Sequence, residues 1–447
     1  MKNFKTIDFT EGYASKNLIA ITVPLIIAYV FNMAYNIVDS LWIGNLLGEK
    51  ALAALTVSTP LILLFSSLSM GATNAIAMLL SKYIGAKDEE KIKSTIATSF
   101  IVTLIFGVIL VLICELGIDG ILSALNTPKS IYSMAKGFLS IYVLGFIFVL
   151  FYLYFTAVLR SYGNSTMQMV SIIACTFLNL VIDPVFIHMF GMNGAAVATL
   201  ISQGIMMLIM VAYIVKNKII RIDIKLISKS LSFDIIAKSI PSMIQQSIPA
   251  ISTAFITLLV AGFGVLSVAA FGISGKLEVI LFYPAMALNM AITSCTGQCF
   301  GAKKMKKAEE YLKWGIVYGG ILLIILTITV VFFAKELTAM FGGGTSVANI
   351  VKVYFATISI GYICNCITSC VLGKVNGFGR PTTAMFVMIF YYVVVRMPLA
   401  KIFSLSSLGL NGIWIAVLIS HIAAVLASLI YNIIFMKVKE TDLQQCA

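Results

Sequence analysis

The chain has 447 residues, of which 60% are hydrophobic and only 11% are charged, and its mean hydropathy is +1.03. This composition excludes an ordinary soluble protein, in which about a quarter of the residues are charged. The net charge of +13 comes from 31 Lys and Arg against 18 Asp and Glu. Because basic residues collect in the cytoplasmic loops of membrane proteins, the charge indicates membrane topology and not nucleic-acid binding.

Apolar runs of about 20 residues, each long enough to cross a bilayer, follow one another along the chain. The runs are continuous and do not alternate, which predicts helices and not the strands of a membrane barrel. A polar stretch at 216–238, with six basic and two acidic residues, separates two sets of runs. We therefore expect an all-α membrane protein of twelve transmembrane helices: 18–41, 53–84, 92–114, 138–159, 167–190 and 194–215, then 240–262, 265–300, 311–333, 347–372, 382–403 and 410–436.

Residues 1–16 are polar and mixed in charge, and no small-residue cleavage site ends the first apolar run. We therefore expect the first helix to insert and stay, and not to be a cleaved signal peptide. With both termini in the cytoplasm, most of the Lys and Arg fall in inner loops. The sequence thus predicts a multi-pass protein of the cell (inner) membrane with both ends cytoplasmic.

The two sets of helices resemble each other, which indicates an internal duplication. Six helices per half give the halves the same orientation, as in parallel repeats, and transporters place substrate between such halves. We expect an N-lobe at 1–215, a cytoplasmic connector at 216–238 and a C-lobe at 239–447. The matching residues include Gly48, Gly85, Ala86, Lys87, Gly163, Gly191, Gly194 and Ser202, which recur as Gly264, Gly301, Ala302, Lys303, Gly379, Gly409, Gly412 and Ser420.

Only three acidic residues, Asp39, Asp183 and Glu278, lie inside the predicted helices. A charge at the bilayer centre costs about 3 kcal/mol on insertion scales, so such acids are candidates for function. Asn36 shares a helical face with Asp39, and Asn179 precedes Asp183 by one turn. Both acids reach a similar depth, and clustered oxygens suit a hard cation. We expect one coupled H⁺ or Na⁺ site at Asp39 and Asp183, with a structural ion pair as the alternative.

The sequence leaves the roles of the charged residues in the second half, and of a proline in the first helix, open. Glu278 and Lys276 lie on different faces of one helix, and Arg396 is another charge inside a predicted helix. Structural pairing and substrate contact stay open for these three residues, because buried charges need partners in either case. Pro24 removes a backbone hydrogen bond within the first helix, either as a tolerated kink or as a hinge that shifts with protonation.

Catalytic and cofactor motifs are missing from the sequence. There is no P-loop, HExxH or GxSxG motif, and no soluble region large enough for a nucleotide-binding domain. The cysteines have no neighbouring His that would favour a metal site. We therefore expect a transporter and not an enzyme, with no cofactor, driven by an ion gradient.

Several segments, in order, resemble the multidrug and toxic compound extrusion (MATE) family. The resemblance covers essentially the whole chain. The segments are Asn36-Ile-Val-Asp39-Ser-Leu-Trp-Ile-Gly44, Val158-Leu-Arg160-Ser-Tyr-Gly163-Asn, Asn179-Leu-Val-Ile-Asp183-Pro184 and Gly194-Ala-Ala-Val-Ala-Thr199.

The resemblance implies two six-helix lobes around a V-shaped cleft, which rock to exchange H⁺ or Na⁺ for organic compounds. The DinF-like branch places an N-lobe cation site at positions matching Asp39, Asn179, Asp183 and Thr199. The NorM-like branch relies on acids in the seventh and tenth helices, where this chain has Gln245 and Gln246 and no acid, respectively. The DinF-like branch is therefore favoured.

We expect a cation-coupled antiporter that exports small, often cationic or amphipathic compounds, working as a monomer in the lipid bilayer. A flippase of lipid-linked oligosaccharides in the same superfamily is the alternative, although a more basic cavity and extra helices are not evident. A membrane-embedded enzyme or scaffold is a more distant rival, because the clustered catalytic residues it needs are not found.

Overall fold

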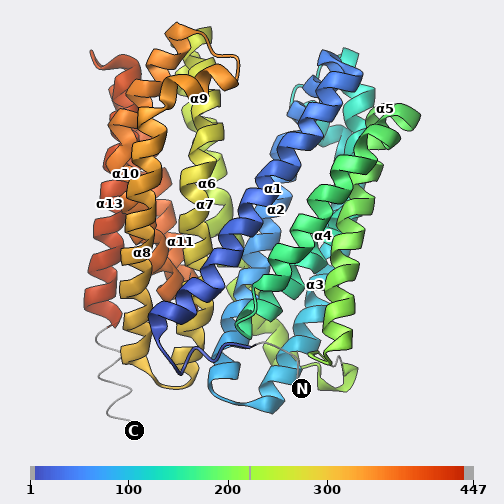
Figure 1. Cartoon of the computed structure of the whole chain (residues 1–447), viewed down its shortest axis with the longest axis vertical. Coiled ribbons are helices and arrows are strands. Elements are labelled where there is room, and N and C mark those ends of the chain that lie inside the picture. The colour runs from blue at the N-terminus through green and yellow to red at the C-terminus, as the bar shows by residue number, and fades with distance from the viewer. Residues whose placement is uncertain (1–5, 221–222, 437–447) are drawn as a thin grey trace. The chain divides into compact units, whose positions relative to one another are not determined.

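The structure is a computed structural model that describes residues 6–220 and 223–436. These residues are almost entirely helical and include no strand. A helix satisfies its own backbone groups, which is why apolar segments in a membrane adopt it. The helices are α1 (Ala14–Leu47), α2 (Glu49–Gly85), α3 (Glu89–Ala124), α4 (Lys129–Ser161), α5 (Thr166–Lys216), η1 (Ile224–Leu226), α6 (Lys229–Ala261), α7 (Val265–Gly301), α8 (Met305–Phe332), α9 (Ala334–Met340), α10 (Thr345–Gly377), α11 (Pro381–Ile389), η2 (Phe390–Arg396), α12 (Met397–Ser404), α13 (Gly409–Tyr431) and η3 (Asn432–Met436) (Figure 1).

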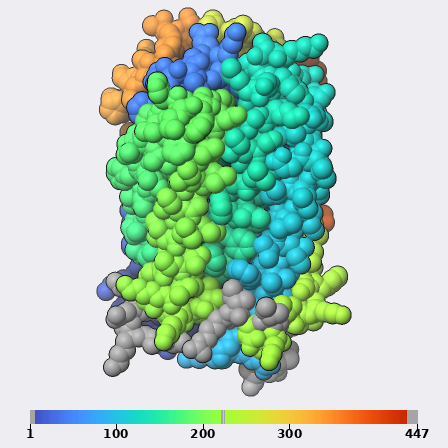
Figure 2. All heavy atoms as spheres, turned by 90° about the vertical axis from the view of Figure 1, so that its right-hand side faces the viewer, coloured from blue at the N-terminus to red at the C-terminus, as the bar shows by residue number. Residues whose placement is uncertain are grey.

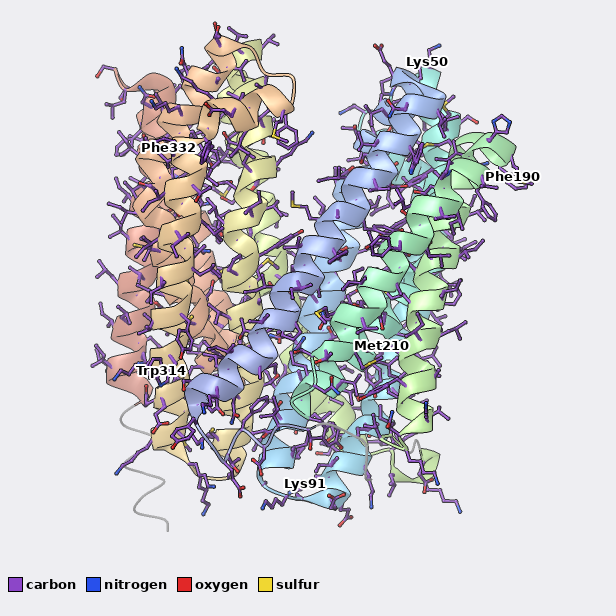
Figure 3. The ribbon with its side chains drawn as sticks, viewed as in Figure 1. Lys50, Lys91, Phe190, Met210, Trp314 and Phe332 are labelled. Carbon is purple, nitrogen blue, oxygen red and sulfur yellow. The ribbon has the colours of Figure 1, made fainter. Side chains whose placement is uncertain are left out.

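Within the described residues, eleven helical segments are long and apolar enough to cross a membrane. One of them, α5, has 51 residues and would measure about 76 Å if straight, more than twice the ~30 Å hydrocarbon core. It bends back at Gly191, whose φ of 59° and ψ of −138° are not helical. Figure 3 shows Phe190 at this turn. The two arms of α5 correspond to the predicted helices 167–190 and 194–215, which confirms the all-α fold of twelve spans.

Several helices are longer than the apolar runs that predicted them. α3 ends at Ala124 and not at 114, so it also contains Glu115 and Asp119. The expectation that only three acids lie inside helices is therefore wrong. Asp119 accepts hydrogen bonds from Tyr132 and Lys136, both at 2.8 Å. Hydropathy detects only the apolar part of a helix, whereas the backbone hydrogen bonding continues into polar residues.

The chain divides into two compact units. Unit 1 contains residues up to Asp8, Val23–Ile84 and Asp88–Ser239, and unit 2 contains Phe9–Thr22, Gly85–Lys87 and the chain from Ile240. The predicted connector 216–238 packs in unit 1, where it contains η1 and the start of α6. Arg221 and Ile222 of this connector lie outside the described residues. The lobes 1–215 and 239–447 remain a prediction about which parts move.

The duplication is visible in the backbone of the two units. Left-handed φ angles, which are strained for most residues, recur at equivalent positions of both halves. Gly163 and Gly379, for example, have φ of 80° and 74° just after the fourth and tenth spans. A Cβ atom on Gly163 would lie 2.5 Å from the Ile7 carbonyl oxygen, so glycine is required there for space as well. The other pairs are Gly48 and Gly264, Lys87 and Lys303, Asn126 and Gly342, and Gly191 and Gly409.

In unit 1, α4 packs between α3 and α5. Small residues allow this close approach: Gly107 of α3 faces Leu150, and Gly137 and Gly145 of α4 face Asn193 and Leu200. Figure 2 shows atoms of α3, α4 and α5 covering one face along its whole length. Because α4 fixes both arms of α5, the polar residues on those arms are held on a rigid support.

In unit 2, α10 is the central helix and packs against α7, α8 and α13. Gly373 and Gly377 of α10 lie against the α7 backbone at Asn289 and Thr293, so neither has room for a side chain. The predicted helix 382–403 is helical but contains a π-helical turn, η2, between α11 and α12. Such turns occur frequently at functional sites.

Candidate cation site

The candidate site of unit 1 lies about two turns deep, near one end of the helices. Asp39 stands eight residues before Leu47, the last residue of α1. Asp183 and Thr199 stand eight residues on either side of Gly191, so the bend in α5 places them at equal depth on its two arms. Figure 1 shows the end of α1 and the bend of α5 at the same end of the unit. At 1.5 Å per residue, all three lie about 12 Å from that end.

The two carboxyl groups and one amide form the centre of the site. Asn179 donates a hydrogen bond from Nδ2 to Oδ1 of Asp183 at 2.5 Å. The carboxyl groups of Asp39 and Asp183 lie close enough to share a hydrogen bond. Because neither ionised carboxylate can donate, such a bond requires a proton on one of them.

Two tyrosines surround this centre. Tyr35, one turn before Asp39 on α1, interacts electrostatically with both carboxylates and lies beside Thr199. Tyr142 of α4 is near Asp39, and its hydroxyl is close to Gln203. These contacts connect α1, α4 and both arms of α5 around one polar group.

The site presents several buried oxygen atoms without a hydrogen-bond partner. Asp183 and Asn179 are fully buried, and Thr199 is 4% exposed. The unpartnered atoms are Asp39 Oδ1, Asp183 Oδ2, Asn179 Oδ1, Thr199 Oγ1 and Tyr35 Oη. Oxygens of carboxylate, amide and hydroxyl groups are the ligands that a hard cation takes.

Among the residues that the structure describes, no basic side chain forms an ion pair with Asp39 or Asp183. The ion pairs that are seen, such as Lys91–Asp88, Lys136–Asp119 and Lys374–Glu309, involve other carboxylates. A buried carboxylate without a counter-charge is unfavourable unless a proton or a cation joins it. The arrangement therefore offers oxygens to which a proton or a cation could bind.

Two of the predicted residues stand apart from this centre. Asn36 is exposed, and its amide donates to the Asn32 carbonyl oxygen at 2.7 Å, one turn earlier on α1. Pro24 lies within α1 about four turns before Asp39, so it can act on the site only through the helix.

The three charges predicted in the second half separate into two environments. Glu278 of α7 accepts hydrogen bonds from Tyr354 and Tyr362 of α10, at 2.6 and 2.7 Å. Arg396 of η2 is buried among polar and aromatic side chains. Lys276 is exposed, with its amine 5.3 Å from the centre of the Phe341 ring.

The sequence reasoning missed the aromatic partners of the acids. Tyr35 precedes Asp39 by four residues, which is the spacing of side-chain neighbours on a helix and could have identified it. Tyr354, Tyr362 and Tyr391 had no such signal, because they contact Glu278 and Arg396 across helices or through a π-helical turn.

Comparison with known families decides the assignment. The sequence model of the MatE family matches residues 24–185 and, a second time, residues 241–402. The chain belongs to the MATE family. The double match also agrees with the duplication seen in the backbone angles, because one family unit covers each half.

Relatives of this MATE chain are multidrug transporters, and solved structures share its fold. It is 29% identical over 442 residues to the probable multidrug resistance protein YpnP of Bacillus subtilis, with 96% of each chain covered. It is 22% identical over 436 residues to the multidrug export protein MepA of Staphylococcus aureus, again covering 96% of each. A crystal structure of MATE in complex with MaL6 has the same fold, with a TM-score of 0.92 and 22% identity over 99% of each chain. The chain is thus a multi-pass transporter of a multidrug efflux family and not an enzyme.

Proposed function

We propose that this MATE protein is a cation-coupled antiporter, which exports small, often cationic or amphipathic organic compounds in exchange for H⁺ or Na⁺. The observation that carries the proposal is the pair of carboxylates, Asp39 and Asp183, held together in unit 1 without a basic partner. The pair requires a positive charge that the described residues do not provide.

The residues around the pair fit either ion. A proton shared between Asp39 and Asp183 would form the hydrogen bond that their separation allows. A sodium ion would find the unpartnered oxygens of Asp39, Asp183, Asn179 and Thr199. In both cases the ion would contact residues of α1 and of α5. Its binding would strengthen the packing of α1 against α5, and its release would weaken that packing.

Cation binding at this site would be coupled to substrate release through α1. Pro24 leaves one backbone carbonyl of α1 without its helical partner, which makes the helix easier to bend there. A bend that depends on the ion at Asp39 would link the site to the rest of the lobe. This makes the N-lobe, 1–215, the part that responds to the ion.

The test is drug efflux from proteoliposomes, with a pH gradient and a Na⁺ gradient imposed separately. The wild type should respond to at least one gradient, whereas Asp39→Asn and Asp183→Asn should lose the response while keeping their size and fold. Because the two residues act as a unit, the double variant should be little worse than the worse single variant. Normal gradient-driven efflux by both single variants, at matched protein levels, would refute the proposed coupling.

A further inference from the structure

Unit 2 contains a second group of charged and polar side chains, formed by α7, α10, η2 and α13, in which Glu278 is half-buried and its partners are buried. On one side, Glu278 of α7 receives the hydroxyl hydrogen bonds of Tyr354 and Tyr362 on a single oxygen, Oε1. On the other side is Arg396 of η2, which is 7% exposed. The two sides meet at Tyr362, which donates to Glu278 and whose ring centre lies 6.4 Å from that of His421, the imidazole beside Arg396. Glu278 and Arg396 therefore bring opposite charges into one group, although they form no direct ion pair.

Arg396 is held by three hydrogen bonds and two aromatic rings. Its Nε donates to Ser420 Oγ at 2.9 Å, and its Nη2 donates to Tyr391 Oη at 2.8 Å and approaches His421 Nε2 at 3.2 Å. Its guanidinium carbon lies 4.8 and 4.5 Å from the ring centres of Tyr391 and Tyr392. A buried guanidinium with this many partners has one fixed position.

The π-helical turn makes this position possible. In an α-helix, residues five apart in the chain point roughly 140° away from each other. In the π-helical turn η2, backbone hydrogen bonds join residues that are five apart in the chain. Residues five apart therefore lie on the same side of the turn, which brings Arg396 over Tyr391. The irregular turn therefore serves to place the guanidinium.

The hydrogen bonds also define the charge of His421. Because Arg396 can only donate, His421 Nε2 must accept and cannot carry a proton. The proton of the neutral ring then lies on Nδ1, which is 2.5 Å from the Tyr391 hydroxyl. The group as a whole contains one carboxylate, one guanidinium and a neutral imidazole, so its charges cancel.

The duplication relates this group to the cation site of unit 1. Ser202 of the sixth span corresponds to Ser420 of the last span, and the next residues are Gln203 and His421. Gln203 lies near Tyr142, which is itself near Asp39, whereas Ser420 and His421 hold Arg396. Both halves thus form a polar group from the same part of the repeat. The group in the first half has two acids and no basic partner, whereas the group in the second half has one acid and one arginine.

We propose that Arg396 is a built-in cation, which neutralises Glu278 permanently and leaves the Asp39–Asp183 pair as the only exchangeable cation site of the described protein. Because Arg396 supplies this positive charge, the second half does not require a bound ion, whereas the first half does. The role of Arg396 in transport rests on the proposed antiport function. The charge balance between Arg396 and Glu278 does not, because it can be measured without transport.

The experiment begins from the Asp39→Asn, Asp183→Asn variant, in which only the second half can show a new ion dependence. Its thermal unfolding midpoint in detergent should be insensitive to Na⁺ exchanged for choline at constant ionic strength, and to a pH series between mildly acidic and mildly basic conditions. Adding Arg396→Met should leave Glu278 without a counter-charge and create stabilisation by Na⁺ or by acid. Adding Glu278→Gln as well should abolish it. Arg396→Lys, which retains the charge, should not create the dependence.

The outcomes separate the two proposals. If the Asp39→Asn, Asp183→Asn variant keeps the ion dependence of the wild type, the proposed cation site is wrong. If the folded variant with Arg396→Met acquires no dependence, the built-in cation is wrong. Should Arg396→Met prevent folding, adding Glu278→Gln should restore a folded protein, because it removes the carboxylate left without a counter-charge. A Glu278→Gln, Arg396→Met variant that also fails to fold would overturn the proposal.

Discussion

Asn179 donates a side-chain hydrogen bond to Asp183 from one turn away on the same helix. A hydrogen bond to a charged group is worth about 1.5–3 kcal/mol, which corresponds to roughly a 10- to 100-fold change in an equilibrium constant. The Asn179→Leu variant removes this donor and one of the oxygens available to a cation. We expect the Na⁺ or H⁺ concentration for half-maximal efflux to rise by about this factor.

The matched control for Asn179 is Thr176→Val on the same arm of α5. Thr176 is buried, and its hydroxyl donates only to the backbone oxygens of Ile172 and Phe31. Its loss should leave the ion dependence of efflux unchanged. Unchanged ion dependence in Asn179→Leu would show that the amide has only a packing role.

At the scale of single residues, the sequence identified the acids but not their surroundings. Asp39 and Asp183 could be found because a charged residue within an apolar run is costly, and Asn179 because it lies one turn from Asp183. Asn36 met the same criterion of spacing, yet it is exposed and bonds to Asn32. Helical spacing gives the face of a residue but not which helix packs against that face.

At the scale of elements, the bend of α5 determines which of its residues meet. A Cβ atom at Gly191 would contact nothing within 4 Å, so only the backbone conformation requires glycine there. Gly191→Ala should therefore destabilise the protein by about 1–3 kcal/mol, through strain and not through a clash. It should also weaken ion-driven efflux, because Asp183 and Thr199 depend on the bend for their common depth.

Gly117→Ala is the control for this variant, since Gly117 lies in α3 and a Cβ atom there also meets nothing within 4 Å. Its φ is helical, so alanine should stabilise by up to about 1 kcal/mol. Thermal unfolding in detergent measures both variants. Equal unfolding midpoints for the two would contradict the role of Gly191.

The existence of the helices could be predicted from hydropathy, whereas their irregularities could not. The expected spans 167–190 and 194–215 flank Gly191 correctly, because the run of apolar residues is interrupted there. The π-helical turn at Phe390–Arg396 leaves no trace in hydropathy, since its residues are as apolar as those of a regular helix. Its presence depends on the partners that Arg396 finds in α13.

At the scale of the whole molecule, the duplication could be predicted from colinear identities and is seen again in paired backbone angles such as those of Gly163 and Gly379. The difference in charge between the halves could not be predicted in this way. At the repeat offset of 218, Asp183 corresponds to Lys401, and neither Glu278 nor Arg396 has a charged counterpart in the first half. Duplication preserved the fold, and the chemistry of the two halves then diverged.

The orientation of the molecule in the membrane is the remaining expectation from charge. In Figure 3, Lys50 and Lys91 lie at opposite ends of unit 1. The positive-inside rule places the Lys91 end, the connector 216–238 and both termini in the cytoplasm. Ser230, at the start of α6, is exposed and suits a labelling site there, whereas Ser228 is half-buried and its backbone N–H donates to Thr98.

Cysteine labelling tests this orientation in a variant without the eight native cysteines. An impermeant maleimide added to intact cells should label Lys50→Cys and should label neither Ser230→Cys nor Lys91→Cys. Permeabilised cells should then show labelling at all three positions, which demonstrates that each thiol is reactive. Labelling of Ser230→Cys in intact cells would reverse the topology, and the ion would then enter the Asp39–Asp183 site from the opposite side. Since Asp39 lies near the Lys50 end of α1, the predicted orientation would place the proposed cation site near the outer surface, the side from which the proposed antiporter would take up its coupling ion.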